Sequence, residues 1–245
     1  PGKRVIGVAR FSEPGLAEQL QSWGIETIRC DLLDPEAVAR LPKLRNIVYM
    51  AGKKFGTNDD PSFAWAMNTY VPALVAREFR ESRLVVFSTL CVYPFAPVVQ
   101  HGWDESVEPG PLGDYANSCV GRERAFAYGS RQWGTPGRLM RLNYSIDMRY
   151  GVLIDIANWV MQEQPIPIAT GHASVIWQGD CNAQMLRSFR HCSTPTSPLN
   201  IGGPELASVR LLAHEFGKRF GKTPRFDDVE QPDAWVNNTL QAQRL

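Results

Sequence analysis

Tyr115, whose phenol can in principle donate or accept a proton, lies at the start of a helical stretch. A second hydroxyl, that of Thr89, ends an apolar strand upstream. A phenol with its ordinary pKa of about 10 is a poor base near neutral pH unless a positive charge lies close to it. Cys119, one helical turn beyond the tyrosine, brings no such charge. Arg122 lies three residues further along, on a similar face of the helix.

Elements that could hold these side chains alternate through the first two-thirds of the chain. The strands are β-branched and apolar on both faces, which is typical of a parallel sheet covered by helices on each side. Alternating strands and helices predict a doubly wound, Rossmann-type α/β domain over residues 1–145. The predicted strands are Arg4–Ala9, Ile25–Cys30, Asn46–Ala51, Arg83–Ser88 and Arg138–Leu142, and the predicted helices are Leu16–Trp23, Pro35–Leu41, Phe63–Glu81 and Tyr115–Gln132.

The remaining residues, 146–245, have shorter elements separated by frequent proline and glycine. This pattern predicts a smaller mixed α/β lobe that forms the substrate side of the molecule, with some elements returning to the main sheet. The expected helices are Val152–Gln164, Cys181–His191 and Ser208–Phe220, and the expected strands are Ile166–Ile168, Val175–Gln178 and Leu199–Ile201.

Several motifs occur in an order that resembles the extended short-chain dehydrogenase/reductases, in their NAD(P)-dependent epimerase/dehydratase branch. The resemblance rests on the segment 85–93 (Val-Val-Phe-Ser-Thr-Leu-Cys-Val-Tyr), on the helix start at Tyr115, and on the segments 177–183 and 200–205. The family pattern at the helix start is Tyr-x-x-x-Lys, in which the lysine lowers the tyrosine pKa and holds the cofactor ribose. Here the lysine position holds Cys119.

The resemblance implies an oxidoreductase or isomerase that acts on a carbohydrate-like or other hydroxyl- or carbonyl-bearing small molecule. Thr89 would orient the substrate, Tyr115 would move the proton, and Cys119 stands in the third catalytic position. Nucleotide-sugar epimerases carry an arginine seven residues before the aspartate that matches Asp180, and this chain has Ala173 there. The implied cofactor-binding residues are Arg10, Asp31, Leu32, Ala51, Gly52, Lys54, Asn68, Ser88 and Tyr115, and the implied substrate residues are Thr89, Asn143, Tyr144 and Trp177.

Two of these positions bear on the adenosine half of the cofactor. Arg10 follows the first strand, where a guanidinium suits the 2′-phosphate of NADP and an acidic residue suits NAD. The sequence therefore predicts NADP over NAD, with a solvated surface arginine as the alternative. Asp31 would accept a hydrogen bond from the adenine, while Asp34 and Pro35 separately have the residue types that begin a helix.

A dinucleotide-binding domain is expected to open with a strand and a glycine-rich turn leading into a helix. The segment from Val5 to Asp34 contains no such turn and matches the second strand, its helix and the third strand. The first strand–helix unit of the fold is therefore predicted to lie upstream of Pro1.

The composition is that of a chain that buries a core, with 44% hydrophobic and 21% charged residues among 245. The formal net charge of +1 argues against nucleic acid or an anionic membrane as partner, and no apolar run approaches the roughly 20 residues that span a bilayer. Five scattered cysteines predict free thiols in a reducing compartment, the cytoplasm, and the scattered histidines predict no metal site. Aromatic residues on the helices 63–81 and 115–132 predict a homodimer.

A second class of function stays open at this stage. Without its lysine, the tyrosine site could persist in a pocket that only binds. The chain would then be a non-catalytic NAD(P)-binding protein, serving as a redox sensor or an assembly subunit. Turnover that depends on the cofactor and on Tyr115 separates the enzyme from this alternative.

Overall fold

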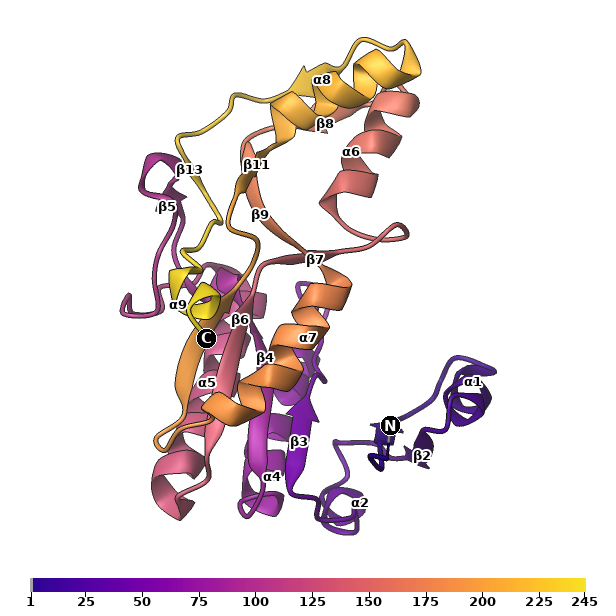
Figure 1. Ribbon diagram of the computed structural model, residues 1–245, viewed down its shortest axis with the longest axis vertical. Coiled ribbons are helices and arrows are strands. Elements are labelled where there is room, and N and C mark those ends of the chain that lie inside the picture. Colours follow the sequence, from indigo (N-terminus) through magenta and orange to yellow (C-terminus); the bar gives the residue numbers. More distant parts are fainter. Residues whose placement is uncertain (1) are drawn as a thin grey trace.

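The structure, a computed structural model, describes residues 2–245. Its centre is a four-stranded parallel sheet in the order β10-β6-β4-β3 (Figure 1). The strands are β3 (Asn46–Tyr49), β4 (Arg83–Thr89), β6 (Gly137–Leu142) and β10 (Ser197–Ile201). Helices α4 (Val71–Glu78) and α5 (Gly113–Trp133) cover one face, and α7 (Gln178–Ser188) covers the other. This arrangement confirms the predicted doubly wound α/β fold.

The two faces of the sheet are buried in alternation along each strand. In β4, Leu84 and Val86 belong to the core beneath α4 and α5, while Val85 belongs to the core beneath α7. In β6, Leu139 belongs to the core beneath α4 and α5, and Met140 belongs to the core beneath α7. Because successive side chains in a strand point to opposite faces, apolar residues at every position produce a sheet buried on both sides.

The first elements form a separate unit. Strands β1 (Ile6–Ala9) and β2 (Glu26–Arg29) pair in parallel as a two-stranded sheet, joined by α1 (Leu16–Ser22). In Figure 1 this unit lies beside the main sheet. Within residues 2–245, no strand pairs with β3 on the side away from β4, or with β1 on the side away from β2. None of the residues in these three elements is buried.

This unit is joined to the main core on one side. Ile28, Leu32 and Leu33 pack against the core beneath α4 and α5, together with Val38 of α2 (Pro35–Ala39). Helix α2 begins as its sequence predicts, because Asp34 accepts hydrogen bonds from the backbone N–H groups of the first turn.

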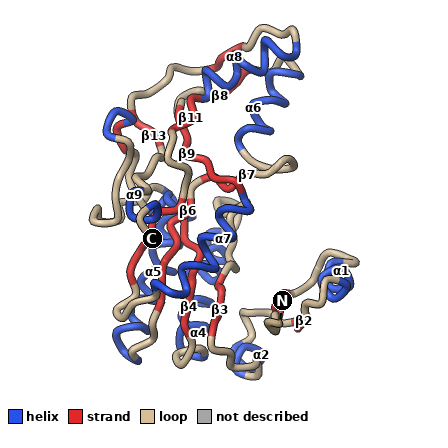
Figure 2. The backbone as a smooth tube through the Cα atoms, viewed as in Figure 1, coloured by secondary structure: helices blue, strands red, loops and turns tan. Residues whose placement is uncertain are grey.

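The chain after β6 builds a smaller group of elements, seen at the top of Figure 2. Strand β9 (His172–Trp177) pairs with β7 (Tyr144–Ile146) and β11 (Leu206–Ser208), while β8 (Pro165–Pro167) pairs with β12 (Arg225–Asp227). Helices α6 (Val152–Met161) and α8 (Val209–Phe220) share a core that includes Ile156, Val160 and Ile166. Strand β10 and helix α7 return to the main sheet.

The helix predicted over Phe63–Glu81 is interrupted. It consists of α3 (Pro61–Trp65), a π-helical turn η1 (Ala66–Tyr70) and then α4. π-turns widen a helix locally and are frequent at functional sites. Here the wide turn carries the fully buried Asn68. Helix α5 packs closely on this turn because Gly121 has no Cβ, which would otherwise overlap the Thr69 hydroxyl.

Several short elements escape prediction because two- to four-residue pieces carry no period. They are the strands β7, β11 and β12, the strand β5 (Ala96–Pro97), which pairs with β13 (Asp233–Ala234), the helix α9 (Leu240–Gln243) and the single turns η2 (Leu90–Val92) and η3 (Val98–Gln100). The helix predicted over Cys181–His191 ends in a separate turn, η4 (Phe189–His191). Of the aromatic residues expected on an exposed helical face, Phe79 and Phe126 are buried instead, while Trp65, Tyr70 and Tyr128 are exposed.

No helix within residues 2–245 has the length and apolar character to span a membrane. All five cysteines are free thiols, and the described residues contain no group of three or more histidine, cysteine or acidic side chains arranged to hold a metal ion.

Candidate functional site

The hydroxyls of Thr89 and Tyr115 come together at the carboxyl end of β4. Strand β4 ends at Thr89, whose Oγ1 accepts a hydrogen bond from the backbone N–H of Cys91 at 3.2 Å and so starts the turn η2. Tyr115 lies in the first turn of α5, near enough to Thr89 for that side chain to lower the pKa of its phenol. Cys119 follows one turn later, fully buried against Val92 and Tyr93. The structure thus assembles the three residues that the sequence places in catalytic roles.

The environment of the tyrosine opposes its ionisation. Burial raises the pKa of the Tyr115 phenol above its usual range, and the Cys119 and Cys91 thiols act in the same direction. The charge of Arg122 and the Thr89 hydroxyl lower it only in part. Burial likewise raises the pKa of the Cys119 thiol, so position 119 is neutral near pH 7. In this state the phenol can donate a hydrogen bond but is a weak base.

A buried charged network lies behind the strand end. Arg141 of β6 pairs with Glu123 of α5 through Nη2 and Oε2 at 2.7 Å, and both side chains are buried. Burial alone lowers the pKa of Arg141, but the bonds and charge of Glu123 outweigh it and hold that pKa above its ordinary value. Ser88 donates to Glu123 Oε1 at 2.6 Å, and Tyr93 accepts from Arg141 Nη1 at 2.6 Å. The predicted cofactor residue Ser88 therefore has its hydroxyl engaged inside the protein.

This network continues into the C-terminal part of the chain. The Tyr93 hydroxyl donates to Asn200 Oδ1 at 3.0 Å, and Asn200 Nδ2 donates to the carbonyl oxygens of Trp103 and Asn238. A continuous set of hydrogen bonds therefore links α5, β6, the turn after β4 and the last segment of the chain, and it fixes the backbone beneath Thr89.

A second buried cluster fixes the end of β3. Asn68 accepts from the backbone N–H of Lys53 at 2.8 Å and donates to the Lys53 carbonyl at 2.9 Å. Its Oδ1 also accepts from Arg122 Nη2 at 2.8 Å. A Cβ at Gly52 would overlap Arg122 Nη2 and lie 2.8 Å from Asn68 Oδ1, so only glycine fits there. The predicted cofactor residues Gly52 and Asn68 thus have a role in the protein's own packing.

The smaller group of elements reaches this end of the sheet through one side-chain bond. Lys54 Nζ donates to Tyr150 Oη at 2.8 Å, in the loop after β7. Tyr144 of β7 is half-exposed. Partial burial is the main reason that the pKa of its phenol is raised, and the nearby Cys91 raises it further. Asn143 donates through Nδ2 to the Trp235 carbonyl at 3.2 Å, and its Oδ1 is buried without a hydrogen-bond partner. Lys54 and Tyr144 therefore both lie near Cys91, which is itself a neighbour of Tyr115.

Other predicted site residues are not brought to Tyr115 by any described hydrogen bond or ion pair. Arg10 is exposed, and its carbonyl oxygen accepts from Arg29 Nη1 at 2.7 Å. Asp31 accepts from the Leu33 backbone N–H at 3.0 Å, and Leu32 packs on the main core. Ala51 is half-buried at the end of β3, and Trp177 is exposed where β9 meets α7.

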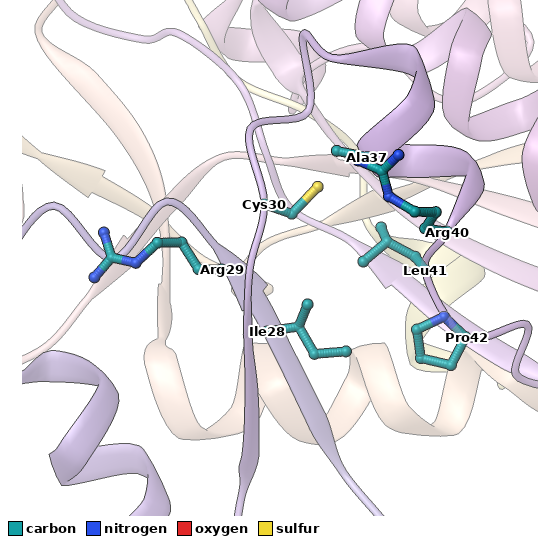
Figure 3. Close-up of a pocket in the computed structure, with 7 residues that line it drawn as sticks. All are labelled: Ile28, Arg29, Cys30, Ala37, Arg40, Leu41 and Pro42. Atoms are coloured by element: carbon teal, nitrogen blue, oxygen red, sulfur yellow. The ribbon is translucent and has the colours of Figure 1, made fainter.

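A hollow of about 170 Å³ lies between β2 and α2 (Figure 3). Its seven lining residues include none of the predicted site residues. In Figure 3 the Arg29 side chain extends away from Cys30, while Arg40 comes from the opposite side on α2. The two guanidinium groups do not converge, so the hollow is not built as an anion site.

Sequence reasoning missed the residues that organise the site from behind. Glu123, Arg141 and Tyr150 look like ordinary polar surface residues on a helix, a strand and a loop, and their spacing carries no motif. One signal was available. Residues 115, 119, 122 and 126 fall on one face of α5, and that face is buried in part at Tyr115 and wholly at the other three positions.

Comparison with known proteins agrees with the fold. No protein-family model matches the chain, and no curated protein matches it by sequence. Among solved structures, UDP-glucose 4-epimerase from Thermus thermophilus in complex with NAD is similar at 18% identity and a TM-score of 0.75, over 99% of this chain and 92% of that one. UDP-glucuronic acid 4-epimerase from Bacillus cereus, in complex with UDP-glucuronic acid and NAD, is similar at 17% identity and a TM-score of 0.80, over 99% of this chain and 84% of that one.

A dTDP-glucose 4,6-dehydratase double mutant from Streptomyces venezuelae, with NAD bound, gives 15% identity and a TM-score of 0.83, over 100% of this chain and 81% of that one. At these identities the likeness shows that the chain has the architecture of these epimerases and dehydratases.

Proposed function

We propose that the protein is a nicotinamide-dependent enzyme of the epimerase/dehydratase type, acting on a carbohydrate-like or other hydroxyl- or carbonyl-bearing small molecule. The observation that carries the proposal is the placement of Thr89 at the carboxyl end of β4 and of Tyr115 near it in the first turn of α5. Ligands of open α/β sheets bind at the carboxyl ends of the strands, where these two hydroxyls lie. The solved epimerases and dehydratases of the same architecture support the class.

In this proposal Thr89 holds the substrate oxygen, and Tyr115 donates or accepts the proton at that oxygen. The nicotinamide, when bound, supplies hydride transfer. Lys54 and Tyr144, which both lie near Cys91, would contact the substrate or the cofactor ribose. The nicotinamide end of the cofactor is supported by the position of Thr89 and Lys54 at or just after the carboxyl ends of β4 and β3.

The pyrophosphate end needs a further element. Within residues 2–245 no glycine-rich turn follows a strand, and β1 and β3 each leave one edge unpaired. We propose that a strand–helix unit enters between these two edges and brings the phosphate-binding turn. Parallel strands on both sides would then pair with it in one continuous sheet.

The choice between the two dinucleotides rests on opposing observations. The similar structures contain NAD, which favours NAD. The exposed Arg10 after β1 favours the 2′-phosphate of NADP. A guanidinium–phosphate contact contributes roughly 1.5–3 kcal/mol, which is about tenfold or more in affinity. Parallel titrations with both dinucleotides, in the chain and in Arg10→Gln, decide between them.

A second function is favoured by a specific observation, the neutral Cys119 beside a phenol whose pKa is raised. In that reading the chain binds a nicotinamide dinucleotide without turnover, as a redox sensor or an assembly subunit.

The deciding experiment follows binding and turnover together. NADH and NADPH binding is measured by fluorescence, and turnover is measured on a panel of sugar-nucleotide, hydroxyl and carbonyl substrates. Turnover lost in Tyr115→Phe with binding retained supports the enzyme. Tight binding with no turnover in either protein supports the sensor. Absence of binding of both dinucleotides in a protein that includes the proposed strand–helix unit would contradict both functions.

We also propose a homodimer through the face that carries Trp65, Tyr70 and Tyr128, which are 40%, 48% and 60% exposed. These side chains give α3, η1 and α5 an aromatic surface of the kind enriched at interfaces. Sedimentation of the chain and of Tyr128→Glu tests it. A single monomeric species at tens of micromolar in both proteins would contradict the dimer.

A further inference from the structure

Arg122 is a buried cation without an acidic partner. The residue is 7% exposed, and within residues 2–245 no carboxylate pairs with it. Its Nη1 donates to the Phe87 carbonyl at 2.9 Å, its Nη2 donates to Asn68 Oδ1, and its Nε is buried with no hydrogen-bond partner. A buried charge is costly unless something nearby offsets it. Neutral carbonyls and one amide provide only part of that offset.

The Arg122 side chain extends into the interior of the protein, toward the ends of two strands of the main sheet. Arg122 reaches beneath the end of β3, where Gly52 lacks the Cβ that would block it, and beside the last residues of β4. The weak acids within range of its charge are the phenols of Tyr49 and Tyr115 and the thiol of Cys119. Of these three, Tyr115 lies about two turns before Arg122 on the same face of α5. The Phe87 carbonyl that accepts from Arg122 is two residues before Thr89, where β4 ends beside this tyrosine.

We propose that the Arg122 guanidinium supplies the positive charge of this site, acting on the Tyr115 phenol from beneath α5 in place of a lysine at position 119. Arg122 is a positioning residue in this role, because it acts through the tyrosine and does not touch substrate. The inference rests on the proposed function for its purpose, since a charge beside Tyr115 matters when that phenol moves a proton. The charge itself is a property of the free protein.

Burial dominates in the free protein and keeps the phenol protonated. A nearby cation favours the charged form of a phenol by about 1–3 pH units, so removing it moves the ionisation of Tyr115 to still higher pH. Other groups act on the same region and must stay unchanged in the test. They are Cys119 and Glu123 on α5, Cys91 after β4, Lys54 after β3, Tyr49 on β3 and Tyr144 on β7.

The test places a difluorinated tyrosine at position 115 of the full chain, because its more acidic phenol titrates in a range where the fold survives. Fluorine NMR then follows its ionisation with pH, with no cofactor or substrate present. In Arg122→Gln the titration is expected to move up by about one pH unit or more. In Arg122→Lys, which keeps the charge, most of that shift is expected to disappear.

Arg138 provides the matched control. It is also 7% exposed and without an acidic partner, and its Nε donates to the His191 carbonyl at 2.9 Å, but it lies at the opposite end of β6. Arg138→Gln should destabilise the fold in the same way as Arg122→Gln and leave the Tyr115 titration unchanged. An unchanged titration in Arg122→Gln, or an equal shift in Arg138→Gln, would overturn the inference.

If Arg122→Gln does not fold, Arg122→Met replaces it, because the methionine side chain fills much of the same space and needs no hydrogen-bond partner. The titration is again expected to move up by about one pH unit or more, and an unchanged titration overturns the inference. Failure of the proposed function is seen separately, because a chain that binds neither NADH nor NADPH can still show the Arg122-dependent titration.

Discussion

The β1–α1–β2 unit and the four-stranded sheet use the same kind of sequence and reach different degrees of burial. In β4, five of the seven residues are buried, and they lie on both faces of the sheet, whereas β1, α1 and β2 contain no buried residue. Both regions are parallel and β-branched. The difference is that β4 has strands on both sides and helices on both faces, while β1 and β2 have only each other. Parallel strands are stable where neighbours bury them, and the sequence of a strand alone does not supply those neighbours.

Hydrogen exchange should show the largest contrast between the two regions. Amides of β4 and β6 open only with the whole fold, whereas those of β1 and β2 are expected to exchange through local opening at least about a thousandfold faster. Mass spectrometry or NMR resolves the two sets. Equal protection in both regions would mean that the unit is held by more than the contacts described.

The buried ion pair of the main sheet should be the most sensitive single position. Glu123→Gln leaves Arg141 buried without its counter-charge and is expected to lower the free energy of unfolding by about 3–5 kcal/mol. The corresponding change in the β1–α1–β2 unit is Glu26→Gln, which removes the exposed partner of Arg4. This variant should have the same urea midpoint as the unchanged protein, within error. The comparison fails if the two variants shift the midpoint equally.

Two valines offer the same chemistry in the two regions. Val85 in β4 is 0% exposed and Val8 in β1 is 36% exposed. Val85→Ala is expected to cost about 1.5–3 kcal/mol of unfolding free energy, and Val8→Ala under about 0.5 kcal/mol. Urea unfolding of both variants measures this. A large loss in Val8→Ala would show that β1 is covered in solution.

The smallest effect concerns pH. The hydrogen bond from Arg4 lowers the pKa of Glu26 in the folded chain. Its contribution to stability is therefore complete above the usual glutamate pKa of about 4.3 and is lost as the pH falls through the lower folded-state value. Carboxyl NMR should find the Glu26 midpoint below that of an unpaired glutamate, and Arg4→Gln should return it. Because both groups are exposed, the urea midpoint of unfolding should change very little as Glu26 titrates.

The architecture was predictable from sequence because the strands of a doubly wound sheet are continuous apolar runs of a distinctive length. The helix 63–81 was found, but its π-turn was not, since nothing in the residue types around Asn68 signals an extra residue in a turn. The separation of β1 and β2 from the main sheet agrees with the reading of Val5 to Asp34 as the second strand, its helix and the third strand, because no described strand lies between β1 and β3.

The site divides in the same way. Tyr115 and Cys119 lie one helical turn apart, which their spacing predicts, whereas the resemblance to a known family is what joined Thr89 to them. Glu123 meets Arg141, and Lys54 meets Tyr150, only because separate elements converge, and pairwise contacts of that kind leave no local pattern. Whether the predicted residues bind cofactor, and whether residue 145 divides two domains, remain predictions.

Without the proposed strand–helix unit, the unpaired edges of β1 and β3 would also affect how the protein behaves at high concentration. An open strand edge presents N–H and C=O groups that a strand from another molecule can pair with, and partly exposed apolar side chains such as Val8 favour that pairing. Self-association would then grow with concentration and produce aggregates of no fixed size. A homodimer through α5 saturates at two copies, so the shape of the concentration dependence tells specific assembly from precipitation.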